Sequence, residues 1–467
     1  MPAATLAALL AAGCALGRDI PDLGRIYDEA AKVHDLRRNP VIVIPGILGS
    51  KLVDDETGTV VWGAFEGDYA NPNRPAGARL FSIPMAEGVP LSELRDGVRS
   101  AGALERVRVH LIGLPIFMNA YIHILEALGV GSYRDQQLAE AGAIDYGPGH
   151  FTCFQFDYDW RRDLVEGAQQ LHAFILEKKS YVVEEMEKRY GIVDADVKFD
   201  IVAHSMGGVL TRYYLRYGAA DLPADGSAPE VTWAGADHVE RAILVAPPNA
   251  GSAQSVMDLV EGRDFGFFLP RYDPVILGTL PAVYQLLPRS RHGAVVDTRG
   301  RPVEDVFAPE LWESMGWGLA DPDRDHVLRR LLPHVESASD RRRIALDHQR
   351  KCLERAARFT AAVDTPAEPP AGLQLYVFVG DAVPTPSVVG VGLDGDVRVV
   401  ARGPGDGTVL RSSALMDERV GRPWEARLVT PIRWEQVFFL FTDHLGLTED
   451  PSFTDNVLYL LLEDPRS

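Results

Sequence analysis

One serine of this sequence stands where a nucleophile is expected. Ser205 lies in the run Ala203-His204-Ser205-Met206-Gly207-Gly208, between an apolar segment and residues with helical spacing. The pattern small-x-Ser-x-Gly is typical of a sharp strand-to-helix turn, because small neighbours tolerate its strained backbone. Such a turn lifts the hydroxyl out of the sheet and places helix N–H groups beneath a reacting carbonyl. We therefore expect a nucleophile for acyl transfer; the alternative is a small-residue turn in an ordinary strand–helix unit.

A nucleophile of this kind needs an orienting carboxylate and a histidine base, which follow it along the chain in that order. Asp406 lies between two glycines, which let a loop turn tightly. His444 is the only one of the twelve histidines that follows it. We expect Ser205, Asp406 and His444 to form a triad, with Asp443 and Asp417 as alternative acids. A surface Asp-Gly turn and an exposed loop histidine are the structural alternatives.

Two backbone N–H groups are needed to bind the oxyanion of such a reaction. One is expected from Met206, the residue after the nucleophile. The other should come from an early loop, and residues 45–50 (PGILGS) suit this role, with Ile47 as the expected donor and Leu48 next. Otherwise these residues form a plain glycine turn. His204 is a poor base candidate, because neighbours at such a turn point apart, and we expect it to pack or hydrogen-bond behind the turn.

Apolar runs bounded by turn residues predict the strands that position these residues, because buried parallel strands have this pattern. Such runs occupy residues 40–45, 151–156, 197–204, 239–246 and 373–380, with 397–401 as a sixth candidate. Helical spacing occurs in residues 22–35, 166–190, 209–217 and 325–361. Strands that alternate with helices imply a mostly parallel sheet covered on both faces.

The chain is therefore predicted to be an α/β protein with the α/β-hydrolase fold. We expect a single domain over residues 21–467. Within it, residues 54–149 are rich in glycine, proline and turns, and residues 249–370 mix aromatic loops with charged helices. Both stretches are expected to be cap and lid insertions over the sheet.

The N-terminal residues 1–20 suggest a signal segment. Residues 5–16 are apolar and small, but the stretch is too short to span a bilayer and resembles the apolar region of a secretory signal. Residues 10–14 (LAAGC) resemble a bacterial lipobox, in which Cys14 would be acylated. We expect a cell-envelope protein, periplasmic or lipid-anchored at Cys14. The alternative is an apolar N-terminal helix on a cytoplasmic protein.

Charge and composition disfavour several kinds of partner. The net charge is −19, which disfavours nucleic acid and electrostatic docking on anionic lipid. Peripheral membrane attachment would need apolar residues or a lipid anchor. No metal or cofactor is expected, because the histidines are scattered and no Gly-x-Gly-x-x-Gly follows the first strand. Cys153 and Cys352 are either a disulfide of an exported protein or two buried thiols.

Taken together, these segments resemble the lecithin:cholesterol acyltransferase family, which includes lysosomal phospholipase A2 and phospholipid:diacylglycerol acyltransferases. The matching segments, in the family's order, are residues 45–50 (PGILGS), 158–161 (YDWR), 203–208 (AHSMGG), 247–251 (PPNAG), 405–409 (GDGTV) and 443–445 (DHL). The apolar start is most similar to bacterial, lipoprotein-type members. Ala203 replaces the glycine of the motif, and the cysteines do not match the disulfides of vertebrate members.

The resemblance implies a serine acyl-enzyme that takes an acyl chain from a lipid ester and passes it to an alcohol or to water. It implies that Trp62 and Leu48 bind substrate, and that Asp159 and Arg161 form structural ion pairs. It also implies a lid after Pro247, whose apolar residues face lipid or pack on the core. Those residues are Phe265, Phe267, Phe268 and Leu269.

Three functions follow, in order of preference. The first is a serine-dependent O-acyltransferase or lipase that acts on a lipid acyl donor and delivers the chain to an alcohol or water. The second is a simple carboxylesterase or phospholipase that transfers only to water. The third is a non-catalytic lipid-binding protein of the envelope. The donor lipid, the acceptor and the oligomeric state are left open by the sequence.

Overall fold

A computed structural model describes residues 21–34, 37–63, 69–103, 107–111, 114–118, 121–264 and 270–466. Cys14 and the four apolar lid residues from Phe265 to Leu269 lie outside these ranges, so their predicted roles stay predictions. Cys153 and Cys352 are both buried free thiols. In the described part of the chain, no helix is both long enough and apolar enough to cross a membrane.

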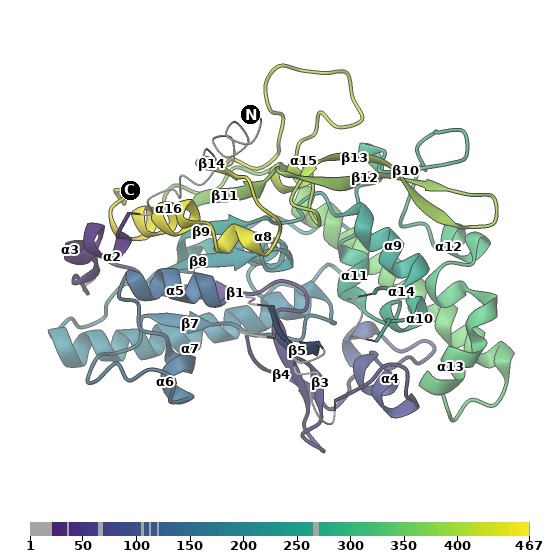
Figure 1. Cartoon of the computed structure of the whole chain (residues 1–467), viewed down its shortest axis with the longest axis horizontal. Coiled ribbons are helices and arrows are strands. Elements are labelled where there is room, and N and C mark those ends of the chain that lie inside the picture. Colours follow the sequence, from purple (N-terminus) through teal and green to yellow (C-terminus); the bar gives the residue numbers. More distant parts are fainter. Residues whose placement is uncertain are drawn as a thin grey trace, which may run out of the picture.

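A six-stranded parallel sheet forms the centre of the molecule, in the order β14-β11-β9-β8-β1-β7 (Figure 1). Its strands are β1 (Val41–Ile44), β7 (Cys153–Gln155), β8 (Phe199–His204), β9 (Val239–Val245), β11 (Gln374–Gly380) and β14 (Gln436–Leu440). The central strands are buried on both faces, which explains why their sequences are apolar throughout rather than alternating.

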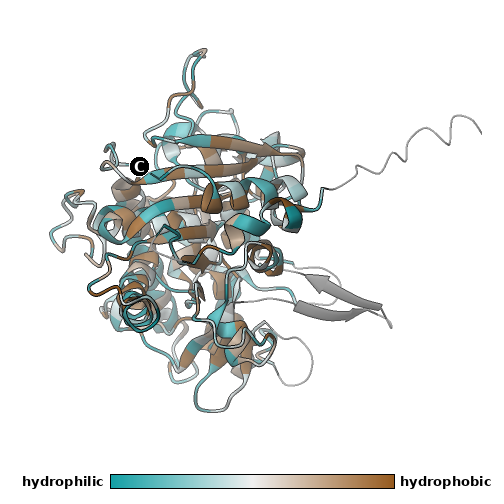
Figure 2. Ribbon diagram, turned by 90° about the vertical axis from the view of Figure 1, so that its left-hand side faces the viewer, coloured by the Kyte–Doolittle hydropathy of each residue, from teal (hydrophilic) through white to brown (hydrophobic). Residues whose placement is uncertain are grey.

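Helices cover both faces of this sheet. On one face, Val41 and Val43 of β1 pack in a cluster with α5 (Ile122–Val130) and α16 (Pro451–Leu462). On the other face, Ile42 and Ile44 pack in a cluster with α7 (Leu164–Tyr190), α8 (Met206–Tyr217) and α14 (Ala338–Asp364). Apolar residues gather around the sheet, and hydrophilic residues gather on the outer helices and loops (Figure 2). The predicted layered α/β architecture is confirmed.

Further elements lie beyond the carboxyl ends of the central strands, on one side of the sheet in Figure 1. The helices there are α4 (Pro75–Phe81), α9 (Ala253–Glu261), α10 (Pro274–Leu277), α11 (Pro281–Gln285), α12 (Pro309–Met315) and α13 (Asp325–Leu331). Two three-stranded sheets join them: β2 (Ser50–Asp54), β3 (Val60–Trp62) and β4 (Val98–Ala103), and β10 (Val295–Val296), β12 (Val383–Val391) and β13 (Val397–Gly405). The predicted limits of the two insertions stay a prediction.

The remaining elements are short. They are α2 (Leu23–Ile26), α3 (Asp28–Ala31), α6 (Gln136–Glu140), α15 (Arg411–Leu415) and the hairpin β5 (Val107–Leu111) with β6 (Leu114–Met118). The helix predicted over residues 22–35 is thus two single turns, α2 and α3. The helix predicted over residues 325–361 is two helices, α13 and α14, because Pro333 lies in the connection between them.

The sixth candidate strand is present, but it lies outside the main sheet. Residues 397–401 belong to β13, which pairs antiparallel with β12 in a hairpin outside the main sheet. Only five residues, 392–396, separate β12 from β13, and a parallel crossover needs a dozen or more. The sixth strand of the main sheet is β14, which pairs parallel with β11 at the sheet edge.

Candidate active site

Ser205 occupies the sharp turn between β8 and α8. Its φ of 54° and ψ of −126° are strained for a non-glycine residue, and its N–H donates to the carbonyl of Val245 at 2.8 Å. The two glycines after it are required by close packing. A Cβ on Gly207 would lie 2.5 Å from the carbonyl oxygen of Pro45, and one on Gly208 would lie 2.9 Å from Pro247. The predicted turn is therefore present, and Ala203 in place of glycine fits within β8.

Three side chains from distant parts of the chain form a hydrogen-bonded row. His444 Nε2 lies 3.0 Å from Ser205 Oγ, and His444 Nδ1 lies 2.7 Å from Asp406 Oδ2. The backbone N–H of His444 also donates to the carbonyl of Asp406 at 3.0 Å. In this arrangement the imidazole can take a proton from the serine while the carboxylate holds the ring and stabilises its charge.

Asp406 is held as an ionised carboxylate. Its side chain is buried, and its Oδ1 accepts from the N–H groups of Thr408 at 2.9 Å and Val409 at 2.6 Å. Burial raises the pKa of this carboxyl, but the charge and hydrogen bond of His444 and the two N–H donors outweigh burial and hold the pKa below its usual value. Gly380 allows this approach, since a Cβ there would lie 2.6 Å from Asp406 Cβ.

The two alternative acids have other partners. Asp443 Oδ1 accepts from the N–H of Gly446 at 2.8 Å in an exposed turn. Asp417 pairs with Arg419 at 2.8 Å. The structure therefore brings Asp406, and neither alternative, to the imidazole.

Residues 45–50, which we call the oxyanion loop after their predicted role, lie directly against Ser205. A Cβ on Gly46 would lie 2.7 Å from Ser205 Cβ and 3.2 Å from its Oγ. The N–H of Gly46 already donates to the hydroxyl of Tyr121 at 2.8 Å. Within the described residues, the N–H groups of Ile47 and Leu48 make no hydrogen bond, and both residues line the cavity next to Ser205. Met206 begins α8, where the first N–H groups have no partner within the helix.

His204 lies behind the turn, as expected. Its Nδ1 lies 3.2 Å from the hydroxyl of Tyr121 and its Nε2 lies 3.1 Å from the carbonyl oxygen of His444. Tyr121 was missed in the sequence because it stands alone in a loop before α5, far from every motif. Its backbone is in the left-handed region, with a φ of 65°, and no local sequence pattern predicts this conformation for a tyrosine.

A largely apolar cavity opens at Ser205. Its apolar lining is Ile47, Leu48, Phe81, Trp160, Pro248, Leu277, Leu280, Val283, Leu286 and Val409. Its volume of about 110 Å³ is smaller than typical ligand pockets, so it can hold only part of a long lipid. Asp258 and Arg263, paired at 3.1 Å, are the charged residues of the lining, which also includes the polar residues Ser252, Gln254, Ser255 and Thr408.

Trp62 lies behind this cavity rather than on its surface. Its Nε1 donates to the carbonyl of Leu48 at 2.8 Å, and its ring packs edge-on against Trp160 at 5.6 Å between centroids. Trp62 therefore supports two residues that line the cavity, and direct contact with substrate stays a prediction. The implied ion pairs are present, because Arg161 contacts Asp159 at 2.7 Å and Asp96 at 2.9 Å.

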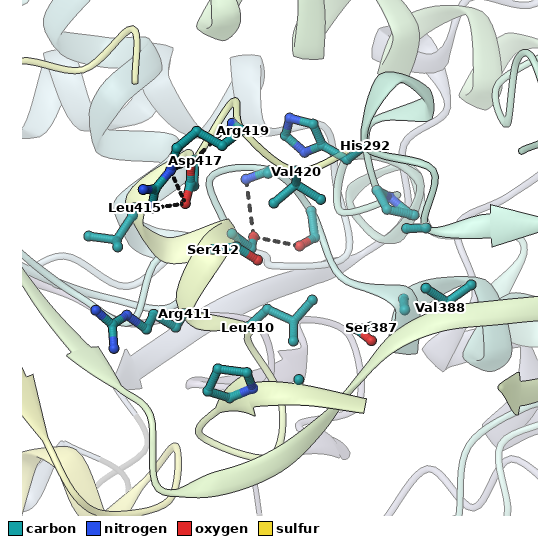
Figure 3. Close-up of a pocket in the computed structure, with 18 residues that line it drawn as sticks. His292, Ser387, Val388, Leu410, Arg411, Ser412, Leu415, Asp417, Arg419 and Val420 are labelled. Atoms are coloured by element: carbon teal, nitrogen blue, oxygen red, sulfur yellow. Dashed lines mark hydrogen bonds and ion pairs between the residues drawn. The ribbon is translucent and has the colours of Figure 1, made fainter. Parts of the chain in front are cut away.

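A second cavity of about 440 Å³ is lined in part by residues 410–413, which follow Asp406 in the sequence (Figure 3). Leu410, Val388 and Val420 line it, and Arg419 pairs with Asp417 at its wall (Figure 3). None of the three residues of the hydrogen-bonded row lines this larger cavity, whereas Ser205 lines the smaller one. Across the residues that the structure describes, no three His, Cys, Asp or Glu side chains cluster as metal ligands would.

Comparison with known proteins supports the family resemblance. Residues 137–310 match the family model described as lecithin:cholesterol acyltransferase. This range contains Ser205 and residues 247–251, but not Asp406 or His444. No curated protein sequence matches the chain.

Solved structures show the fold. A Tle4–Tli4 complex contains a chain with a TM-score of 0.57 and 15% identity, over 91% of this chain and 98% of that one. Lipase 1 from Pelosinus fermentans has a TM-score of 0.34 and 12% identity, over 92% of this chain and 99% of that one. EstA from Clostridium botulinum has a TM-score of 0.32 and 13% identity, over 96% and 99%. The first likeness, with the parallel sheet and the nucleophile turn, agrees with the predicted α/β-hydrolase fold.

Proposed function

We propose that this protein is a serine-dependent enzyme that takes an acyl chain from a lipid ester through an acyl-enzyme on Ser205. The observation that carries the proposal is the hydrogen-bonded row Ser205–His444–Asp406, whose serine lines a largely apolar cavity. The match to the lecithin:cholesterol acyltransferase model favours a lipid ester over other esters.

The first half of the reaction forms the acyl-enzyme. Ser205 Oγ attacks the ester carbonyl while His444 Nε2 takes the hydroxyl proton, and Asp406 stabilises the resulting imidazolium. The carbonyl oxygen becomes an oxyanion, which accepts hydrogen bonds from the N–H groups of Met206 and Ile47. The C–O bond to the leaving alcohol then breaks, and that alcohol takes its proton from His444.

The second half transfers the acyl chain. An alcohol or a water gives its proton to His444 and attacks the acyl carbonyl, so that Ser205 leaves and recovers its proton. A lipid alcohol is the acceptor in an acyltransferase, and water in a lipase. The apolar lining of the cavity suits an acyl chain, and the Asp258–Arg263 pair offers polar contacts to the rest of the lipid.

The test is incubation with labelled phospholipid in plain buffer, with added sterol, or with added diacylglycerol, followed by identification of the products. We expect free fatty acid or acylated alcohol from the wild type and neither from Ser205→Ala. A fluorophosphonate probe should label the wild type at Ser205. Undiminished turnover by Ser205→Ala would contradict the serine mechanism. An unlabelled serine and no product would favour the non-catalytic lipid-binding alternative.

We also propose a location in the cell envelope, with the protein periplasmic or lipid-anchored at Cys14. The support is the apolar, lipobox-like sequence of residues 5–16. Metabolic labelling with a radioactive fatty acid, compared between wild type and Cys14→Ser, tests the anchor. Label that is retained by Cys14→Ser would contradict it.

A further inference from the structure

The oxyanion loop and the catalytic histidine are connected by a chain of hydrogen bonds that runs behind the nucleophile. The chain passes from the N–H of Gly46 to the hydroxyl of Tyr121 at 2.8 Å, and from Tyr121 to His204 Nδ1 at 3.2 Å. It ends where His204 Nε2 meets the carbonyl oxygen of His444 at 3.1 Å. None of these bonds takes part in the proton transfers of the proposed reaction.

The groups at the two ends of this chain of hydrogen bonds determine which atom is the donor and which the acceptor in each bond. A backbone N–H can only donate, so the Tyr121 oxygen accepts from Gly46. A carbonyl oxygen can only accept, so His204 carries its proton on Nε2 and donates to His444. A neutral imidazole has a single N–H, so Nδ1 of His204 accepts, and the donor is the remaining proton of Tyr121. All the groups are satisfied without a charge.

The environment keeps this chain neutral. Tyr121 is 5% exposed and His204 is 3% exposed. Burial, together with the neighbouring His444, lowers the pKa of His204 to about 3, and burial raises the pKa of Tyr121. The ring of His204 lies 4.7 Å from the ring of His444, so a second cation there would oppose the imidazolium that forms during the reaction.

We propose that Tyr121 and His204 are positioning residues, which together hold the backbone of His444 at a fixed distance from the oxyanion loop. The backbone of His444 is then anchored on both sides, since its N–H donates to the carbonyl of Asp406 and its carbonyl accepts from His204. A displaced base or oxyanion donor costs rate even when the substrate still binds. This proposal rests on the proposed acyl-transfer function.

The first test is Tyr121→Phe, which removes one hydroxyl and leaves Gly46 and His204 without their partner. We expect kcat for a labelled phospholipid to fall about 10- to 100-fold while KM changes by less than about threefold, since Tyr121 does not line the cavity. The matched control is Tyr214→Phe, a buried tyrosine on α8 whose hydroxyl has no partner among the described residues. It should leave kcat unchanged within about twofold.

The second test uses rescue. The amide of His204→Gln has a donor and an acceptor and can bridge Tyr121 to His444, whereas His204→Leu has neither. We expect His204→Gln to retain a kcat at least about tenfold above that of His204→Leu. Tyr121→Phe combined with His204→Leu should lose little beyond the worse single variant, because the chain is already broken. Multiplicative losses, or wild-type kcat in Tyr121→Phe and His204→Leu, would overturn the proposal.

A third measurement does not depend on turnover. Nitrogen-15 spectra of histidine-labelled protein, assigned with His204→Gln, report the tautomer of each ring. We expect His204 to stay neutral with its proton on Nε2 down to about pH 4, because its pKa is about 3. Tyr121→Phe should alter this signal. Protonation of His204 near pH 6 in the wild type would overturn the bridge, whereas an intact signal without any esterase activity would overturn the proposed function alone.

Discussion

At the scale of single residues, Asp406 shows how a buried carboxylate is kept in its ionised form. Its Oδ1 accepts hydrogen bonds from two backbone N–H groups, and its Oδ2 is hydrogen-bonded to the imidazole of His444. An amide in its place would present the wrong hydrogen-bonding pattern to the ring, and the imidazole would adopt the wrong tautomer.

We therefore predict that Asp406→Asn lowers kcat about 10³- to 10⁴-fold and changes KM little, measured with a soluble ester. The control is Asp443→Asn, one residue from the base in sequence, whose carboxylate caps an exposed turn. It should retain kcat within about twofold. A large loss in Asp443→Asn, with Asp406→Asn near wild type, would reassign the orienting acid.

The residues of the row could be predicted from the sequence because a local motif marks Ser205 and the chain order of the three residues is fixed. Only one histidine follows Asp406, so chain order selects His444 without any structure. Tyr121 could not be found in this way, because the chain has 15 tyrosines and nothing local distinguishes this one. Its role depends on packing between segments that lie 75 and 83 positions apart.

At the scale of elements, the site depends on how closely the oxyanion loop approaches the nucleophile turn. Glycine at position 46 is required by this contact, since a Cβ would lie 2.7 Å from Ser205 Cβ and 3.1 Å from the carbonyl oxygen of His204. One of the two elements would have to move if a side chain were added.

We predict that Gly46→Ala lowers kcat/KM at least about 10²-fold, because misplacement by about 1 Å can cost this much. The rate of fluorophosphonate labelling should fall in parallel. The control is Gly129→Ala in α5, where an added Cβ meets nothing within 4 Å. Gly129→Ala should keep activity and raise stability by about 0.5–1 kcal/mol. Wild-type turnover in Gly46→Ala would show that the loop has room to adjust.

The strands also differ in how well the sequence predicts them. β1, β8, β9 and β11 are interior strands whose apolar runs are distinct, and all were predicted within about two residues. β14 was missed, because it is an edge strand with Gln436 and Phe439 exposed and its run is short. Its place is set by pairing with β11, from Tyr376 opposite Gln436 to Gly380 opposite Leu440.

Phe378 on β11 packs between the edge strand β14 and the helix α16, which covers the sheet there. Its ring is buried, stacked on Phe438 at 4.5 Å and edge-on to Phe453 of α16 at 5.1 Å. We predict that Phe378→Ala lowers the free energy of unfolding by about 3–5 kcal/mol in urea titrations. Phe439→Ala, at a partly exposed ring on β14, should cost no more than about 1 kcal/mol. Equal losses in the two variants would contradict this assignment of the core.

At the scale of the whole molecule, the site is assembled from segments that are far apart in the sequence. The oxyanion loop follows β1, Ser205 follows β8, and His444 follows β14, so parallel strands bring their carboxyl ends to one edge of the sheet. The fold class and the residues of the hydrogen-bonded row follow from such rules. The limits of the cavity do not, because they depend on how α9, α10 and α11 pack over that edge.

Long-range ion pairs join the late segments of the chain to one another. Arg291 pairs with Glu418 at 2.6 Å and with Asp364, at the end of α14, at 2.9 Å. Arg289 pairs with the same aspartate at 2.8 Å, and His292 lies 3.2 Å from Glu418. Three segments that are distant in sequence therefore meet in one charged network beside the second cavity.

Glu418 gives this network a defined dependence on pH. Burial raises the pKa of Glu418, but its hydrogen bonds and ion pairs with Arg291 and His292 lower it to about 2 in the folded protein. The folded pKa lies below the unfolded value, so the stabilisation is complete above about pH 4.5 and is lost as the pH falls toward 2.

We predict that Glu418→Gln has a lower melting temperature than the wild type at pH 7, and that this difference shrinks steadily below pH 4.5. Glu368→Gln, at an exposed contact of 3.6 Å to Arg433, should match the wild type at every pH. A difference for Glu418→Gln that stayed constant from pH 7 to pH 3 would mean that packing, not charge, joins these segments.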